Sequence, residues 1–233
     1  MAAVTVAGED IAGLTIAARR GAKARARVVF EHGRIPDDLT SLRVMAEPRD
    51  VHNVHLEGPP AQATLNENAT FEIDGLAGRR VFQIMDPPKG WFLKRATHGG
   101  NDITDNGYVF TPAEDVDGFE IVMTTRPQIV TGSVANDKGT PVDESTVIVF
   151  PQDPDKWTGD GGRSYAFAQS DQSGHFRISE LPAGSYFAIA IDADVAVDWT
   201  DPEWLGRAAK TATRFTLEEG ATKRLDLKLS GSW

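Results

Sequence analysis

The residue types that usually carry chemistry are sparse and scattered in this sequence. It contains no cysteine, which excludes thiolate metal sites, cysteine nucleophiles and disulfides. Of its five histidines, only His52 and His55 lie close together. On a strand, residues three positions apart point to opposite faces, so this pair does not favour a shared metal ion. We interpret both as surface histidines.

Enzymatic motifs are also missing from the sequence. It has no HExxH or HxxE zinc motif, no G-x-S-x-G nucleophile elbow and no recognisable Ser/His/Asp order. We therefore expect no catalytic residue, no resident cofactor and no enzyme activity.

One loop, residues 152–165, has the composition of a binding site. It combines several glycines with Asp153, Asp155 and Asp160, and such oxygen-rich loops can bind Ca²⁺, although the spacing matches no EF-hand. Trp157 in the same loop offers an aromatic surface on which a sugar can stack. Three interpretations stay open: a solvated acidic loop, a Ca²⁺ site and a carbohydrate site.

Charge and hydropathy exclude two classes of partner. The formal net charge is −10 and the pI is near 5.0, and no Lys/Arg cluster is interleaved with aromatic residues, so we expect no nucleic-acid binding. No apolar run approaches the roughly 18 residues of a membrane helix. The first residues lack a basic region before an apolar core, and we do not expect a signal peptide in them.

The elements around the loop belong to a repeat. ATFEIDGLAGRRVFQI (69–84) recurs 105 residues later as GHFRISELPAGSYFAI (174–189), and DIAGLTI (10–16) recurs at the same spacing as DVDGFEI (115–121). A weaker third copy, LDLKLS (225–230), lies near the end. Alternating apolar residues in the longer segments predict two strands each, which we interpret as hairpins.

The remaining alternating segments predict further short strands and an all-β fold of two tandem Greek-key β-sandwiches of the Ig/transthyretin-like kind. These strands are expected at residues 24–30, 42–47, 107–111, 128–134, 145–150 and 164–169. One short helix is expected at 201–210, capped by Thr200, with Trp204, Leu205 and Ala208 on an apolar face that covers a sheet edge or barrel end.

Pro127 sets the expected domain boundary, because proline cannot donate to a strand ladder. We place module 1 at residues 1–126 and module 2 at residues 127–233.

The DIAGLTI copy resembles a segment that closes a module, so residues 1–20 are interpreted as a terminal strand left from a preceding module. Its apolar residues Ile11, Leu14 and Ile16 are expected to dock by strand addition on a sheet edge, either of the first module or of a neighbouring chain.

Residues 126–230 resemble the carboxypeptidase regulatory-like (transthyretin-like, prealbumin-like) domain. The family pattern of G-x-V, a G-x-P turn and D-x-x-G-x-F-x-x-x-x-L-P-x-G-x-Y falls on Gly132, Val134, Gly139, Pro141, Asp171, Gly174, Phe176, Leu181, Pro182, Gly184 and Tyr186. Gly174 is expected at positive φ, and the Tyr186 hydroxyl is expected to satisfy a buried backbone group. The first half is similar more loosely, with Arg79 and Arg80 where Gly184 and Ser185 stand.

This resemblance implies tandem modules of a bacterial multi-domain surface protein, located outside the cell or in the cell envelope. The expected function is a non-catalytic structural or protein-interaction array whose partners are neighbouring modules of the same or adjacent chains. The alternative is a carbohydrate- or surface-binding module that acts through the 152–165 loop.

Overall fold

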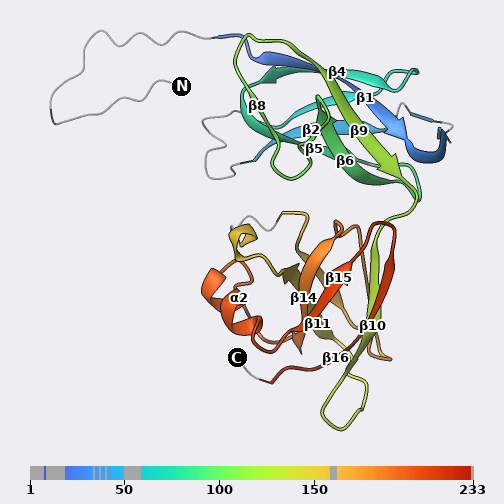
Figure 1. Ribbon diagram of the computed structural model, residues 1–233, viewed down its shortest axis with the longest axis vertical. Coiled ribbons are helices and arrows are strands. Elements are labelled where there is room, and N and C mark those ends of the chain that lie inside the picture. Colours follow the sequence, from blue (N-terminus) through green and yellow to red (C-terminus); the bar gives the residue numbers. More distant parts are fainter. Residues whose placement is uncertain are drawn as a thin grey trace. The chain divides into compact units, whose positions relative to one another are not determined.

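Two compact units, residues 1–123 and 124–233, make up the chain in a computed structural model (Figure 1). The structure describes residues 8, 19–33, 35–36, 38–39, 41–49, 59–157 and 162–231. Within these residues the fold is all-β with one short α-helix, which confirms the predicted pair of β-sandwiches. No helix among them is long and apolar enough to cross a membrane.

The first unit consists of two facing sheets. Its elements are β1 (Ala22–Phe30), the 3-10 turn η1 (Glu31–Gly33), β2 (Arg43–Pro48), β3 (Ala61–Thr64), β4 (Thr70–Leu76), β5 (Gly78–Met85), β6 (Phe92–His98), β7 (Asn101–Asp102), β8 (Tyr108–Phe110) and β9 (Val116–Thr124). The strand order is β4-β1-β9-β6-β7 in one sheet, called the β1 sheet, and β3-β2-β5-β8 in the other. β1 and β9 are parallel neighbours.

The second unit repeats this strand plan. Its elements are β10 (Ile129–Ala135), β11 (Ser145–Pro151), the 3-10 turn η3 (Pro154–Lys156), β12 (Ala166–Gln169), β13 (His175–Ser179), β14 (Gly184–Asp192), α2 (Pro202–Ala208), β15 (Thr213–Leu217) and β16 (Thr222–Lys228). The orders β13-β10-β16 and β12-β11-β14-β15 reproduce β4-β1-β9 and β3-β2-β5-β8 of the first unit. β10 and β16 are again parallel. The hairpin β6–β7 is replaced by α2.

Small residues on β1 and large ones on its neighbours build the first core. Ala22, Ala24 and Ala26 point inward and are almost fully buried, in alternation with basic residues that point outward. The space above them holds buried phenylalanine rings that meet edge to face or tilted, at centroid distances of 5.4 to 6.5 Å. These rings are Phe71, Phe82, Phe110 and Phe119.

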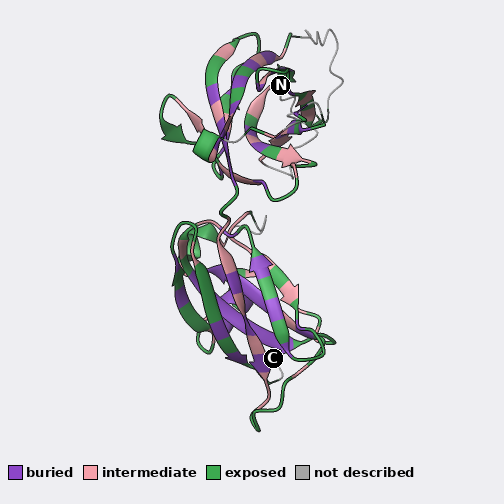
Figure 2. Ribbon diagram, turned by 90° about the vertical axis from the view of Figure 1, so that its right-hand side faces the viewer, coloured by how far each residue is buried: buried purple, intermediate pink, exposed green. Residues whose placement is uncertain are grey.

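The second unit buries both faces of its β11 sheet (β12-β11-β14-β15). One face packs on the β10 sheet through a core that includes Val147, Phe176 and Tyr186. The other face is covered by α2, whose apolar residues join Phe150 and Phe187 in a second cluster. β11 and β14 are therefore buried along nearly their whole length. Figure 2 shows such buried stretches in purple. The helix covers a sheet face, and the predicted edge or barrel-end position is wrong.

The cap of α2 also differs from the prediction. Asp201, and not Thr200, accepts hydrogen bonds from the backbone N–H groups of Glu203 and Trp204. Thr200 donates its hydroxyl to the carboxylate of Asp198 instead. Both residue types suit the cap position, and the preceding turn decides between them because it already uses the threonine side chain.

The predicted hairpins at 69–84 and 174–189 are wrong. β4 and β5 lie in different sheets, and so do β13 and β14. Only Ala77 separates β4 from β5, with Gly75 and Gly78 beside it at φ angles of 80° and 71°, so the chain turns across the sandwich. Alternation indicates that one face of each strand is buried, but it does not identify the strand alongside.

Arg80 takes the structural place of Tyr186 in the first unit. Arg80 lies near the start of β5 and pairs with Pro48 of β2. Tyr186 lies near the start of the equivalent strand β14 and pairs with Pro151 of β11. The Tyr186 hydroxyl donates to the carbonyl of Pro182 at 2.7 Å, which confirms its predicted role. Arg80 is 0% exposed, and its guanidinium donates to the carbonyl oxygens of Ala77 at 3.0 Å and Pro59 at 2.9 Å. Each side chain thus satisfies a carbonyl group of the turn between the two sheets, and Arg80 also binds the segment before β3.

Truncation of the buried face of β13 tests the assignment of its two faces. Phe176 is 4% exposed, and Phe176→Ala is expected to lower the free energy of unfolding by about 3–5 kcal/mol. Arg177 follows it and points to solvent, so Arg177→Ala is expected to change the same quantity by less than about 0.5 kcal/mol. Urea denaturation of both variants measures the difference, and equal losses would contradict the assignment.

Candidate functional site

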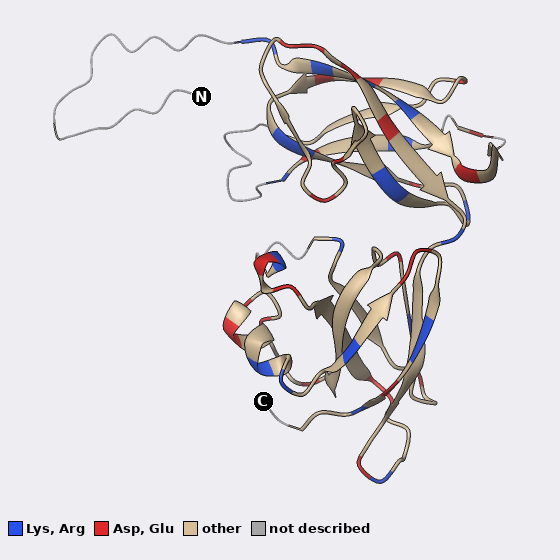
Figure 3. Ribbon diagram, in the orientation of Figure 1, with Lys and Arg blue, Asp and Glu red and all other residues tan. Residues whose placement is uncertain are grey.

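The outer face of the β1 sheet carries a charged ladder of alternating sign. Basic residues of β1 lie between acidic residues of its two neighbours, β4 and β9 (Figure 3). The ladder consists of Lys23, Arg25 and Arg27 on β1, Glu72 and Asp74 on β4, and Asp117 and Glu120 on β9. It follows from the alternation of β1, whose alanines face the core and whose cations therefore face outward.

Two β-bulges bring acidic residues to the ladder. One extra residue of β4 is accommodated opposite Ala22–Ala24, and one extra residue of β9 opposite Ala24–Ala26. Each bulge contains an Asp–Gly pair, and Gly75 and Gly118 adopt φ angles of 80° and 87°. The Asp117–Gly118 pair of the DVDG segment therefore forms a bulge inside β9.

Short ion pairs join all three strands of the ladder. Lys23 Nζ lies 2.8 Å from Glu72 Oε2, and Arg25 Nε lies 2.9 Å from Glu72 Oε1. On the other side, Arg25 Nη1 lies 2.9 Å from Asp117 Oδ1 and Arg27 Nε lies 2.9 Å from Glu120 Oε2. Hydrogen bonds from Lys23 and then Arg25 hold the pKa of Glu72 below its ordinary value, and the same contact with Glu72 raises the pKa of Lys23.

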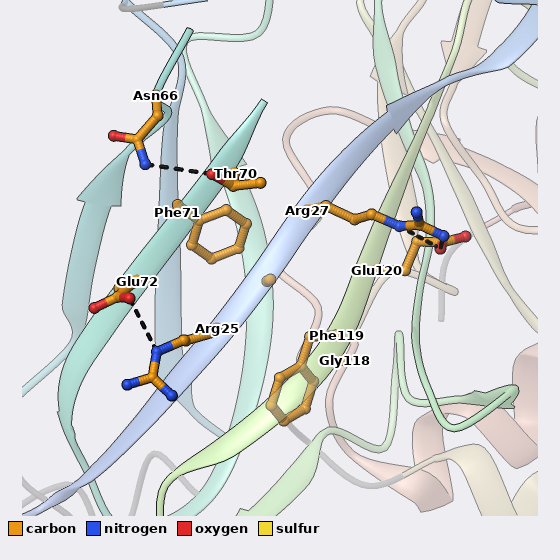
Figure 4. Close-up of a pocket in the computed structure, with 10 residues that line it drawn as sticks. Arg25, Arg27, Asn66, Thr70, Phe71, Glu72, Gly118, Phe119 and Glu120 are labelled. Carbon is orange, nitrogen blue, oxygen red and sulfur yellow. Dashed lines mark hydrogen bonds and ion pairs between the residues drawn. The ribbon is translucent and has the colours of Figure 1, made fainter. Parts of the chain in front are cut away.

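A hollow of about 530 Å³ opens within the ladder. It lies over the row in which Ala26 of β1 stands between Phe71 of β4 and Phe119 of β9. Figure 4 shows Arg25 turned toward Glu72 and Arg27 turned toward Glu120, so the two guanidinium groups point away from each other and leave the space open.

The chemistry available in the hollow is ionic. Its charged groups neutralise one another, and Asn66 donates to the hydroxyl of Thr70 at 3.3 Å. The hollow contains guanidinium, carboxylate, amide and hydroxyl groups, but no histidine or lysine lines it. Cross-strand ion pairs of this kind stabilise strand pairing and register. The arrangement therefore ties β4, β1 and β9 together.

The predicted loop site is only partly described. Asp153 caps the 3-10 turn η3 and accepts a hydrogen bond from the backbone N–H of Asp155 at 3.1 Å, so its carboxylate has a structural partner. Asp160 lies outside the described residues, and the Ca²⁺ site stays a prediction. Among residues that are described, no group of three or more His, Asp or Glu side chains is placed to hold a metal ion.

Trp157, in the first half of the same loop, is half-buried. Its indole N–H donates to the carbonyl of Pro151 at 2.9 Å, and its ring packs against Phe150 at a centroid distance of 6.0 Å. These contacts fix the orientation of the indole, while its role in binding stays a prediction. His52, His55, Ile11, Leu14 and Ile16 lie outside the described residues.

An aromatic patch beside this loop was not found from the sequence. It consists of Tyr165, Phe167 and Trp199, with ring centroids 4.7 Å apart for Phe167–Trp199 and 6.1 Å apart for Tyr165–Trp199. Phe167 is 42% exposed, because the alternation of the edge strand β12 points it away from the core. That alternation is the signal that could have identified it. Trp199 is distant in sequence, and only the fold brings it alongside.

Comparisons with known proteins give weak matches. No protein-family model matches the sequence, and no curated protein matches it. The Bacillus anthracis TIE protein is 11% identical over 91% of this chain, which spans 34% of that chain, with a TM-score of 0.29. Shaft pilin SpaA of Lactobacillus rhamnosus GG is 10% identical, covering 93% and 100% of the two chains, with a TM-score of 0.33. A minor pilin of Streptococcus agalactiae is 11% identical, covering 91% and 97%, with a TM-score of 0.31. Similarities at this level assign neither a family nor a function to this chain.

The lowered pKa of Glu72 predicts acid sensitivity of the ladder. Stability from a carboxylate whose pKa is lowered on folding is complete above its ordinary value of 4.5 and is lost as the pH falls through the lowered value. Glu72→Gln removes this dependence. We therefore expect that, when the pH is lowered from about 5 to about 2, the melting temperature of the Glu72→Gln variant falls less than that of the parent protein.

Calorimetry across this pH range measures the effect. The matched control is Glu67→Gln, at an exposed glutamate in the turn between β3 and β4. If Glu72→Gln and the parent protein lost stability in parallel, the ion pairs of Glu72 would not contribute to folding.

Proposed function

We propose that the chain is a pair of non-catalytic structural or protein-interaction modules from a secreted or cell-envelope protein. The observation that carries this proposal is the common strand plan, which each unit completes separately by pairing its own first and last strands around its own core. A unit of this kind can be placed in series with others, because its fold needs no strand from a neighbour.

The polar surfaces support the same proposal. The outer face of the β1 sheet is an ionic ladder whose members pair with each other, and the residues that line its hollow include no nucleophile with an adjacent general base. In the second unit, polar side chains cover the corresponding face of the β10 sheet, including Thr131, Ser133 and Asp226. Such surfaces favour solubility and contacts between modules over catalysis.

The proposed module boundary is residue 126, in the segment between β9 and β10, with residues 1–20 as a strand left from a preceding module. The second module is proposed to be a carboxypeptidase regulatory-like domain. Its support is the corner formed by Tyr186 and Pro182 together with Gly174, which has a φ of 76° and whose carbonyl accepts from the N–H of Val134. The proposed partners are neighbouring modules of the same or adjacent chains.

Independent folding of the second unit tests the structural proposal. A fragment of residues 124–233 contains a complete strand set and both of its clusters, so we expect it to fold cooperatively without the first unit. Its heteronuclear NMR spectrum should overlay on the corresponding signals of the full chain. A fragment with the narrow signal dispersion of an unfolded chain would overturn the two-module proposal.

A second candidate function is carbohydrate or surface binding through the 152–165 loop. The observation that favours it is the aromatic patch, which lies next to this loop and exposes the ring of Phe167. Aromatic faces at the surface are suitable platforms for sugar rings, whose apolar C–H faces pack against them.

A glycan array, run with and without Ca²⁺, tests this alternative. Phe167→Ser should abolish any glycan signal, since it removes the exposed ring. Val109→Ser is the matched control, because Val109 is 54% exposed on a strand of the other unit. Absence of a glycan signal for the parent protein would rule out the carbohydrate function, and a Ca²⁺-dependent signal would support the predicted site at Asp153, Asp155 and Asp160.

A further inference from the structure

We propose that each unit is a shear clamp that carries tension along the chain, an inference that rests on the structural function proposed above. The term shear clamp denotes the parallel pair of first and last strands, β1 with β9 in the first unit and β10 with β16 in the second. The clamp would keep a unit folded when its two ends are pulled apart, as happens to a spacer between a surface and a partner.

The direction of the strands decides how force enters the second unit. The chain enters β10 at Ile129, which pairs with Thr222, and leaves β16 at Lys228, which pairs with Ala135. Because the strands are parallel, the entry and exit points lie at opposite ends of the ladder. Tension therefore slides β10 and β16 past each other, and the evenly spaced bonds of a parallel ladder share the load. Peeling would instead break them one at a time.

The ladder of the second unit is continuous. Seven consecutive residue pairs join β10 to β16 without a register shift. At Gly132 the two backbones approach so closely that an added Cβ would lie 1.7 Å from the carbonyl oxygen of Leu225. The Ser133 hydroxyl adds a hydrogen bond to Asp226 at 2.8 Å across the same pair. These contacts hold the two strands in one register.

The rest of the second unit is shielded from the load. Residues 136–221, with β11 to β15 and α2, lie in sequence between the two clamped strands. Just outside the ladder, each end of the unit makes one backbone hydrogen bond to this interval: Gln128 accepts from Glu180, and Ser230 donates to Ala190 of β14. A pull on the ends breaks these single bonds first and then loads the β10–β16 ladder before the remaining elements, so the ladder sets the resistance of the unit.

The first unit has the same clamp with added ion pairs. β1 and β9 run side by side with their arrows in the same direction (Figure 1). Two ion pairs cross this strand pair, Arg25–Asp117 at 2.9 Å and Arg27–Glu120 at 2.9 Å. A third, Arg20–Asp115 at 2.7 Å, joins the residues just before the two strands. β9 also pairs with β6 on its other side. Sliding of β1 past β9 would therefore have to break the ion pairs of the charged ladder that join these two strands.

Single-molecule force spectroscopy with two pulling geometries tests the clamp. The sequence has no cysteine, so introduced cysteines are unique attachment points. Thr125→Cys with Gly231→Cys loads the second unit in shear. Lys138→Cys with Gly231→Cys loads it by peeling, because Lys138 lies in the turn after β10, at the end of the ladder where β16 also finishes. All three positions are exposed.

In shear we expect one unfolding event that releases on the order of 35 nm of chain. Its force is expected to exceed the peeling force by a factor of about three or more, since several ladder bonds must break together. Both double variants should share one melting temperature, so the difference reports geometry and not stability. Equal forces in the two geometries would overturn the clamp.

A second comparison tests the ion pairs of the first unit, with cysteines at Arg19 and Thr125. Arg27→Gln removes a bridge between β1 and β9, whereas Arg43→Gln removes the ion pair with Asp86, which lies outside the clamp. We expect only Arg27→Gln to lower the unfolding force in shear. Equal losses of force in the two variants would contradict the role of the charged ladder. Failure of the clamp would leave the independent folding of residues 124–233 unaffected, so the two proposals fail separately.

Discussion

Parallel pairing between the first and last strands of each unit is the constraint on which the rest of the structure depends. A tight hairpin cannot join parallel strands, so the chain between β1 and β9, or between β10 and β16, must leave the sheet and return to it. It does so by building the second sheet and one flanking strand, β4 or β13, on the other side of the first strand. The sandwich, its core and the exposed sheet edges follow from this closure.

Strand β1 shows how one short sequence meets two demands. Its alanines leave room for phenylalanine rings from the strands around it, while its basic residues make ion pairs with acids on both sides. The bulges at Gly75 and Gly118 shift Asp74 and Asp117 relative to β1 and increase the local twist. Surface ion pairs contribute little individually. Their significance here is their position between strands whose register sets the topology.

The two units differ mainly in one interval of the common plan. Between β5 and β8 the first unit forms β6 and β7, which extend the β1 sheet beyond β9. The second unit forms α2 in this interval, and the helix covers the outer face of the β11 sheet instead. In the described part of the β10 sheet, β16 is therefore an edge strand that pairs with β10. The aromatic patch of Tyr165, Phe167 and Trp199 lies in the same unit, beside the 152–165 loop. The same scaffold thus presents an ionic face in one unit and an aromatic surface in the other.

The sequence by itself determined the fold class, most strand positions, the apolar face of the helix, the positive φ of Gly174 and the role of Tyr186, because alternation, turn chemistry and capping are local properties. Tertiary structure decided the rest. The tertiary structure places β4 and β5 in opposite sheets. It has a buried Arg80 in the first unit at the position equivalent to Tyr186, and Asp201 caps the helix. It also assembled the charged ladder from segments nearly 100 residues apart and brought Trp199 to Phe167. Alternation indicates which side of a strand is buried, but the strand alongside is selected by packing of the whole unit, so neither site could be read from local patterns.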